Sequence, residues 1–312
     1  MTPSEAALYR AFQRRASALT PAMAAALLAA YATIRDGLSD SELTRIIQLG
    51  FLDRLIGQAF STALLNVAFQ PVREQMRRSV AQSFRYVAGT IPVPPRSNLA
   101  IRFDVLNPRV IDAIRGLETR VITTLHTEIR ETVRAYAENA LRDGVGPRTW
   151  AKQVRSVIGL APNQLQEVAN YRDALQGLNG RTLSSYTLRD TRYDRMAKAG
   201  TITPAQIETA VGRYQKRRIA LNAATNARTA TLDSLKEGQR LSWIDAAEKG
   251  IIDIERLQKT WVTVLDGRER PEHHDMDGET VGFEEPFSNL EMVPGESTFN
   301  CRCLARVFLA RN

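Results

Sequence analysis

Apolar residues recur at three- and four-residue steps from Val110 to Ala140, and this stripe constrains the fold more than any other feature of the chain. Asn107-Pro108 precedes it and Gly144 follows it, as is typical of helix ends. The spacing predicts one α-helix of about 55 Å at 1.5 Å per residue. Such a helix usually lies against other long helices or against a partner. The stripe consists of Val110, Ile114, Leu117, Val121, Leu125, Ile129, Val133, Tyr136 and Ala140.

The same reasoning predicts helices along most of the chain. Thr20-Pro21 has the pattern of an N-cap followed by proline at the first helical position, and Gly37 is expected to end that helix. Ser39 and Glu42 have the spacing of a capping box that opens the next helix. The predicted helices cover residues 20–37, from 39 onward, 51–86, 107–144, 147–158, 163–178 and 203–247.

Two segments depart from the helical pattern. Residues 88–106 contain Pro92, Pro94 and Pro95, which favour extended backbone, and they form the clearest boundary. After Gly250 the composition changes, and Gly, Pro and Asp become frequent. There KTWVTVLDG and CRCLARVFLA alternate like strands, the first running into an Asp-Gly turn.

These patterns predict a mainly α protein. We expect an extended body of long helices that carries a small α+β C-terminal module with short antiparallel strands. The predicted divisions are a helical N-terminal region over 1–87, a Pro-rich linker over 88–106, a long-helix body over 107–250 and the module over 251–312.

Composition narrows the class of protein. Hydrophobic residues make up 44% and charged residues 24%, as in folded globular proteins. The net charge of +8 permits contact with nucleic acid or an acidic surface without requiring it. A bridge between Cys301 and Cys303 would be strained, which favours a reducing compartment. The uncharged stretches 16–34 and 55–72 are too rich in Ala or polar residues for a strong membrane span, so no membrane contact is expected.

Two histidines and both cysteines gather near the C-terminus, and three interpretations remain open. His273, Cys301 and Cys303 could supply three ligands to zinc, with Asp266, His274 or Asp275 as the fourth. Alternatively, the two cysteines face one side of a strand as small buried side chains while Arg302 points outward; this interpretation is favoured. A Cys-His nucleophile pair lacks any surrounding catalytic signature. No catalytic residue is therefore predicted, and zinc is the only cofactor considered.

A basic stretch in the second half of the chain permits contact with DNA or an acidic partner. A solvated helix face is the simpler interpretation. The residues concerned are Arg189, Arg192, Arg195, Arg213, Lys216, Arg217 and Arg218.

The run KTWVTVLDGRERPEHHDMDGETV, then EEPF and PGESTFNCRC, resembles the C-terminal signature of the phage Mu F-like minor head proteins, a family related to phage head morphogenesis proteins. GVGPRTWAKQVRSVIGL, NYRDAL and LRDTRYDRMAKAG are also similar, so the resemblance covers residues 107–312. Where the family often shows Ala-Arg-Thr-Glu, this chain has Ala227-Arg228-Thr229-Ala230. The matching C-terminal residues are Trp261, Asp266, Arg270, His273, Gly278, Phe287, Pro294, Gly295, Asn300, Cys301, Arg302 and Cys303.

The resemblance implies a minor head protein bound at the portal vertex inside the head, which aids head assembly and genome packaging or delivery. The implied partners are the portal protein, with the major capsid protein and packaged DNA as further candidates, and several copies surround the portal. The implied locations are the virion and, during assembly, the host cytoplasm. No enzymatic activity is expected. The alternatives are a DNA-binding internal protein ejected with the genome, or a Cys/His-dependent enzyme.

Structural roles are expected for the signature residues. Trp261 should pack in the core of the module, and Asp266 should pair with Arg270 to tie its loops. His273 should bridge its loop to the cysteine strand through a hydrogen bond or a metal. Gly278, Asn300 and Arg302 complete this structural motif.

Overall fold

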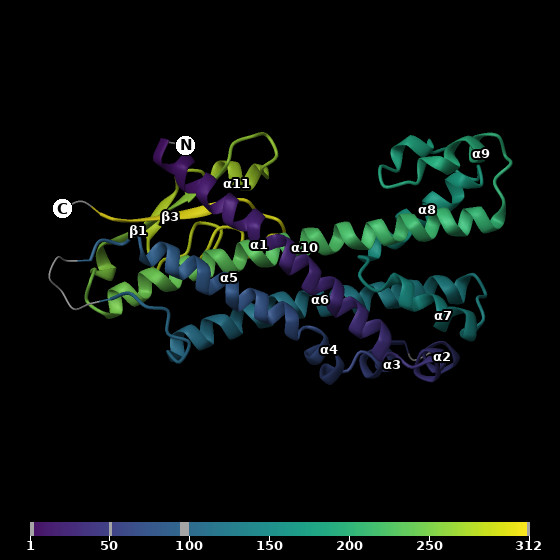
Figure 1. The fold of residues 1–312 in the computed structure, drawn as a ribbon, viewed down its shortest axis with the longest axis horizontal. Coiled ribbons are helices and arrows are strands. Elements are labelled where there is room, and N and C mark those ends of the chain that lie inside the picture. Colours follow the sequence, from purple (N-terminus) through teal and green to yellow (C-terminus); the bar gives the residue numbers. More distant parts are fainter. Residues whose placement is uncertain (1–2, 50–51, 94–99, 311–312) are drawn as a thin grey trace. The chain divides into compact units, whose positions relative to one another are not determined.

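The computed structural model describes residues 3–49, 52–93 and 100–310, which form helices and one small sheet (Figure 1). The helices are α1 (Pro3–Gly37), α2 (Asp40–Leu49), α3 (Leu52–Ala59), α4 (Thr62–Ala68), α5 (Gln70–Ala88), α6 (Pro108–Arg142), α7 (Pro147–Val157), α8 (Pro162–Leu175), α9 (Asp194–Lys198), α10 (Pro204–Glu248) and α11 (Pro271–Asp275). The strands are β1 (Leu257–Val262), β2 (Thr280–Gly282) and β3 (Leu304–Leu309). The predicted mainly α fold with a small α+β module is confirmed.

The chain forms two compact units, each built from separate stretches of sequence. The first contains Met1–Ala25, Val72–Val121 and Thr225–Asn312, and the second contains Ala26–Pro71 and Ile122–Ala224. Helices α1, α6 and α10 contribute residues to both units. The boundaries predicted at 87, 106 and 250 stay predictions.

The long helices follow the predicted pattern. Helix α6 begins at Pro108 and ends at Arg142, and the positive φ of Gly144 (66°) stops it as expected. Helix α10 begins with a reciprocal cap in which Gln206 N donates to Thr203 Oγ1 and Thr203 N donates to the Gln206 side chain. The capping box at Ser39 and Glu42 is also present.

Two helix predictions are wrong. Helix α1 does not start at Pro21 but runs through it from Pro3 to Gly37. Proline removes one helical hydrogen bond, and Thr20 Oγ1 donates to the Ala16 carbonyl at 2.7 Å in the same turn. Buried packing along the helix outweighs the cost of this single break.

The single helix predicted over 51–86 is three helices, and its first residue, Phe51, lies outside the described residues. Ser61 caps α4 by accepting from Leu64 N at 3.3 Å. Pro71 stands in the first turn of α5, where its missing N–H costs nothing. Both signals are local and interrupt an otherwise continuous apolar pattern.

Of the Pro-rich segment 88–106, residues 94–99 lie outside the described part of the chain, and 100–104 form no regular structure.

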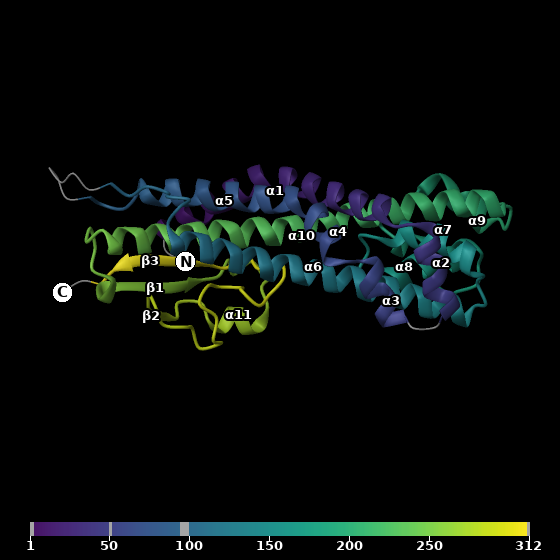
Figure 2. The same ribbon diagram turned by 90° about the horizontal axis from the view of Figure 1, so that it is seen from below.

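The sheet is antiparallel with the order β2-β1-β3. It lies along the second half of α10 (Figure 2), and Val262 and Leu304 pack against Leu235 there. Trp261 stands opposite Ala305 in the β1–β3 register. The cysteines were expected on the last strand, but β3 begins at Leu304, directly after Cys303. They therefore belong to the irregular segment that leads into the strand.

Among the described helices, α1 alone is long and apolar enough to cross a membrane by length and composition. Part of its apolar surface is used within the protein, where Phe12, Leu27 and Ile34 are buried. The absence of membrane contact stays a prediction.

Candidate functional site

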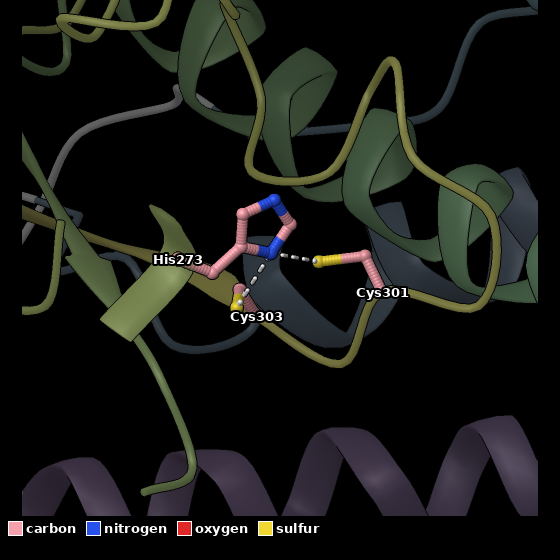
Figure 3. Close-up of side chains that lie close together, drawn as sticks. All are labelled: His273, Cys301 and Cys303. Carbon is pink, nitrogen blue, oxygen red and sulfur yellow. Dashed lines mark hydrogen bonds between the residues drawn. The ribbon is translucent and has the colours of Figure 1, made fainter. Parts of the chain in front are cut away.

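His273, Cys301 and Cys303 meet in the interior of the C-terminal module. His273 lies on the short helix α11, and the cysteines lie just before β3 (Figure 3). Their exposed fractions are 4%, 5% and 3%. His273 Nδ1 is 3.4 Å from Cys301 Sγ and 3.7 Å from Cys303 Sγ. The three ligand atoms lie within 4.8 Å of one another. We call these three residues the His-Cys cluster.

Thr263 joins the His-Cys cluster to the end of β1. Its Oγ1 donates to the His273 carbonyl at 2.8 Å and accepts from Trp261 Nε1 at 3.0 Å. The same oxygen lies 3.5 Å from Cys303 Sγ. Sequence reasoning missed Thr263, although the alternation that made Trp261 a core residue also places Thr263 on the same side of the chain.

Trp261 is fully buried and holds the histidine ring. The two rings are 5.3 Å apart in an edge-to-face arrangement, and Phe287 packs on Trp261 at 5.2 Å in the same way. Met276 completes this small core. The structure therefore places Trp261 in the module core, as the sequence analysis expected.

The two thiols influence each other. The hydrogen bond from Cys303 lowers the pKa of Cys301, and the positive charge of Lys236 acts in the same direction against burial. The same hydrogen bond, together with burial, raises the pKa of Cys303. The two thiols therefore shift each other's pKa in opposite directions. Lys236 is itself buried and donates to the Pro294 carbonyl at 2.6 Å.

Gly278 and Gly295 of the signature occupy positions where a side chain would be strained. Gly295 has a φ of 76°, and a Cβ there would overlap the side chain of Cys301. Gly278 has a φ of 89°, and its N–H donates to the Trp261 carbonyl at 2.9 Å. Both positions need glycine for the turn, and Gly295 also needs it for the close approach.

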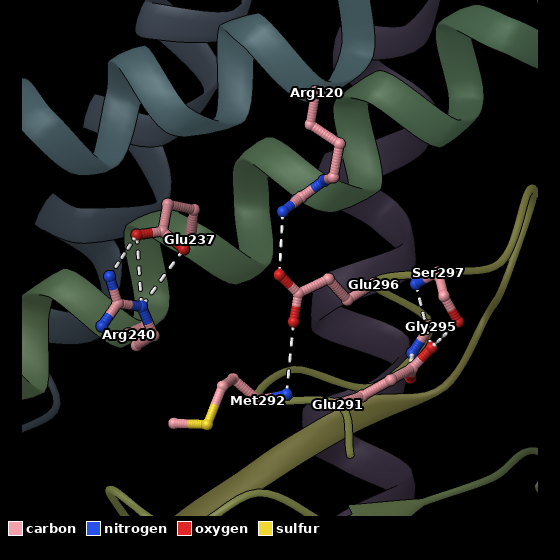
Figure 4. A network of polar contacts seen from close by, with 8 residues as sticks. All are labelled: Arg120, Glu237, Arg240, Glu291, Met292, Gly295, Glu296 and Ser297. Atoms are coloured by element: carbon pink, nitrogen blue, oxygen red, sulfur yellow. Dashed lines mark hydrogen bonds and ion pairs between the residues drawn. The ribbon is translucent and has the colours of Figure 1, made fainter. Parts of the chain in front are cut away.

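The loop that carries Gly295 is organised by Glu291, which the sequence analysis did not single out (Figure 4). Its buried carboxylate accepts from Gly295 N at 2.6 Å and from both N and Oγ of Ser297. Burial alone would raise the pKa of Glu291, but these hydrogen bonds lower it. Glu296 extends the network, accepting from Arg120 at 2.8 Å and from Met292 N at 3.2 Å.

Asp266 does not pair with Arg270 as expected. Arg302 binds its carboxylate through two hydrogen bonds of 2.6 Å, and Arg268 adds another of 2.6 Å. Arg302 is therefore half-buried and paired rather than pointing outward, because a two-pronged guanidinium contact outweighs solvation of the free side chain. Arg270 donates instead to the Phe299 carbonyl at 3.2 Å.

None of the predicted fourth ligands belongs to the His-Cys cluster within the described residues. Asp266 is occupied by the two arginines. His274 is exposed and lies 3.5 Å from the exposed Asp275. Glu269 instead lines the same small pocket as the cluster, and its Oε2 is buried without a hydrogen-bond partner among the described residues.

That pocket measures about 290 Å³, including space open to solvent. Sites for small organic ligands usually measure about 300–1,000 Å³. The space beside the thiols therefore lies at the lower end of this range and would hold an ion, a few waters or a small ligand.

A second, larger pocket of about 1150 Å³ lies beside the first, and we call it the arginine pocket. One of its lining residues is Arg228 of α10. Its Nη2 donates to Gln13 at 3.1 Å, and its Nε is buried without a hydrogen-bond partner among the described residues. Asn300 N donates to Thr229 Oγ1 at 2.9 Å, which joins the cysteine segment to the helix. The lining residues are Tyr9, Arg228, Arg268, Arg270, Phe299, Asn300 and Arg302.

Most of the basic residues proposed for DNA contact have internal partners in the second unit. Asp190 binds both Arg192 and Arg213, at 2.6 and 2.7 Å. The remaining pairs are Arg189 with Asp194, Arg218 with Glu167, and Arg217 with the carbonyls of Leu188 and Arg189. Arg195 lies on α9 and Lys216 on α10. These ion pairs reduce the free positive charge of the stretch.

Comparison with known proteins gives one match. The family model described as phage Mu protein F-like protein matches residues 131–306, more than half of the 312 residues. No curated protein and no solved structure matches the chain. The resemblance seen in the sequence is confirmed. The chain therefore belongs to the phage Mu protein F-like family, which has a role in phage head morphogenesis.

Proposed function

We propose that this chain is a minor head protein that binds the portal vertex inside the phage head, where it aids head assembly and the packaging or delivery of the genome. The family match over residues 131–306 carries this proposal. Several copies would surround the portal at equivalent sites, because a symmetric ring offers one surface repeatedly. Assembly would take place in the host cytoplasm, with the major capsid protein as a further partner.

The use of the signature residues supports an architectural role. Trp261, His273 and Cys303 pack against one another, and Asp266 binds Arg302. These side chains hold the loops of the module together. The family is one of phage structural proteins, which supports our proposal that the chain catalyses no reaction.

Assembly with and without the portal tests this function. Heads assembled with portal should contain the chain in several copies at one vertex, visible in particle images and countable by quantitative mass spectrometry. Heads assembled without portal should lack it, and the isolated chain should co-purify with portal rings. Equal incorporation in both kinds of head, spread over the shell, would contradict binding at the portal.

The arginine pocket favours a second function, contact with packaged DNA. It gathers four guanidinium groups, of which Arg268 and Arg302 bind Asp266, while Arg228 and Arg270 donate to an amide oxygen and a backbone carbonyl. In the stretch over 189–218, four of the seven basic residues are paired with carboxylates. Contact with phosphates would give an affinity that falls steeply with salt, with a slope of about −0.9 per phosphate contact. An ejected internal protein would use the same contact.

Fluorescence anisotropy with a short duplex over a range of salt tests this second function. Arg228→Ala with Arg270→Ala should weaken binding and flatten the salt dependence by about one unit for each phosphate that is no longer bound. Arg189→Ala with Arg217→Ala serves as the matched control, with the same loss of charge elsewhere. Equal weakening in both double variants, or binding that ignores salt, would argue against the pocket.

A further inference from the structure

We propose that His273, Cys301 and Cys303 bind one zinc ion, with Glu269 as the fourth ligand, and that this ion locks the C-terminal module. The site goes beyond the proposed head function, since it concerns how the module is held rather than what it contacts.

The geometry of the His-Cys cluster matches tetrahedral zinc. Zinc binds sulfur at about 2.3 Å and imidazole nitrogen at about 2.0–2.1 Å, and a tetrahedral angle then separates nitrogen from sulfur by about 3.5 Å. The observed separations from Nδ1 are 3.4 Å to Cys301 Sγ and 3.7 Å to Cys303 Sγ. In Figure 3 the same ring nitrogen faces both sulfur atoms. One ion placed among these atoms contacts all three without a large movement of the chain.

Hydrogen bonding alone explains this arrangement less well. A ring nitrogen carries either one proton or one lone pair, so Nδ1 makes one good hydrogen bond. Two sulfur atoms nevertheless compete for it in a buried space. A metal ion removes the conflict, because each thiol loses its proton and both sulfurs and the nitrogen become ligands at once.

The kind of metal follows from the donor set. Two thiolates and one imidazole are typical ligands of zinc, whereas calcium and magnesium require oxygen. The two negative charges of the thiolates balance the charge of the ion, and the Glu269 carboxylate would add one further negative charge. The setting is enclosed, which suits a structural site.

Glu269 is the candidate for the fourth position among the described residues, although its carboxylate lies outside the group of ligand atoms that are all within 4.8 Å of one another, so its side chain would have to turn towards the ion. It lines the same pocket as the His-Cys cluster, four residues before His273. Its buried Oε2 lacks a hydrogen-bond partner among the described residues, and a buried carboxylate oxygen without a partner is costly. Coordination would satisfy it and would complete four ligands.

The proposed ion would connect three segments that the small sheet does not hold together by itself. These are the loop with Glu269, the short helix α11, and the segment before β3. Helix α11 has five residues, too few to be stable alone. Metal binding would therefore contribute directly to the folding of the module.

The test uses the full chain, expressed without a histidine tag and purified under reducing conditions. Inductively coupled plasma mass spectrometry should find about one zinc ion per chain. A zinc chelator should lower the melting temperature, and cobalt added after chelation should restore it and give the visible absorption of tetrahedral, thiolate-bound cobalt. Zinc well below one equivalent, with no such cobalt spectrum, would overturn the site.

Variants then assign the ligands. His273→Gln should weaken zinc binding by roughly 100-fold or more, because even groups that only orient a ligand contribute about 10–100-fold. His274→Gln is the matched control, since the neighbouring ring is exposed, and it should retain the metal. Equal zinc retention in the two variants would contradict the assignment. The cobalt spectrum of the unaltered chain needs no variant, so it decides the question even if His273→Gln does not fold.

Glu269→Ala tests the fourth position separately. Weaker zinc binding together with an altered cobalt spectrum would support Glu269 as a ligand. Unchanged affinity and an unchanged spectrum would overturn that part of the assignment and leave the other three ligands in place.

Discussion

At the scale of single residues, Thr263 links the two side chains on which the His-Cys cluster depends. Its hydroxyl satisfies both the His273 carbonyl and the Trp261 indole in a fully buried position. Valine has nearly the same shape but can make neither hydrogen bond. The residue therefore offers a clean measure of what the polar contacts contribute.

We expect Thr263→Val to lower the free energy of unfolding by about 1–3 kcal/mol, the cost of leaving a buried polar group unsatisfied. The control is Thr280→Val, because Thr280 is the exposed first residue of β2 and its hydroxyl pairs with Thr260 at 2.8 Å in a partly buried position. The control removes one partly buried hydrogen bond rather than two fully buried ones, so it should change stability less. Urea unfolding measures the free energy of unfolding of both variants. Equal losses would show that the buried hydrogen bonds of Thr263 contribute no more than the Thr280 bond.

A pH dependence follows from Asp266. Hydrogen bonds from Arg302 and Arg268 hold its pKa well below the ordinary value. A carboxyl group with a lowered folded-state pKa stabilises the fold above its unfolded pKa of about 3.9. That contribution is lost as the pH falls through this value towards the folded pKa.

Asp266→Asn removes the contribution. The difference in urea midpoint between the original chain and the variant should be constant above about pH 6 and shrink towards acid pH. A difference that stays constant down to about pH 3 would contradict this account.

At the scale of elements, α10 contains two glycines in different settings. Gly238 lies against α5, where a Cβ would overlap the Val80 carbonyl and the Ser83 side chain. Ser83 Oγ donates to the Leu235 carbonyl at 2.5 Å at this close approach. Gly212, on the same helix, has open space around it.

Alanine at these two positions should therefore change the free energy of unfolding in opposite directions. Gly212→Ala should raise the free energy of unfolding by up to about 1 kcal/mol, because alanine favours helix. Gly238→Ala gains the same propensity but must move two backbones apart, so it should be destabilising by about 1–3 kcal/mol. Thermal unfolding of the two variants checks this, and stabilisation by Gly238→Ala would rule out the close approach.

The helices could be predicted from the sequence where a single feature, such as an apolar stripe or a capping residue, dominates the local pattern. The stripe over 110–140 and the caps at Thr203 and Gly144 gave α6 and α10 close to their true ends. Pro21 misled the prediction because a buried helix tolerates one missing hydrogen bond. The region 51–86 misled it because Ser61 and Pro71 end helices locally within an unbroken apolar pattern.

The candidate site was predictable in its residue types but not in its partners. Cys301, Cys303 and His273 were recognised because sulfur and imidazole are rare and clustered in the sequence. The partner of Asp266 and the lining of the arginine pocket were not, because Tyr9, Arg228 and Arg302 come from distant parts of the chain. Which arginine reaches which carboxylate is decided by tertiary packing.

At the scale of the whole molecule, the family match begins at residue 131. The compact unit that contains the C-terminal module nevertheless includes an N-terminal segment that the family match does not cover. Phe12 and Ala16 of α1 pack with Leu235 of α10. Val262 and Leu304 of the sheet belong to the same cluster. Phe12 and Ala16 are thus part of the core that supports the sheet.

Phe12→Ala tests this dependence. Truncating a buried phenylalanine costs about 3–5 kcal/mol when its neighbours are in the same cooperative unit. Leu28→Ala on the exposed side of the same helix should cost less than about 1 kcal/mol. Trp243 and Trp261 lie in the first unit and Trp150 lies in the second, so tryptophan fluorescence during urea unfolding follows the first unit once Trp150 is replaced by Phe in every variant. If Phe12→Ala leaves that transition where it was, the N-terminal segment does not support the module, and the matched region would have to be stable without it.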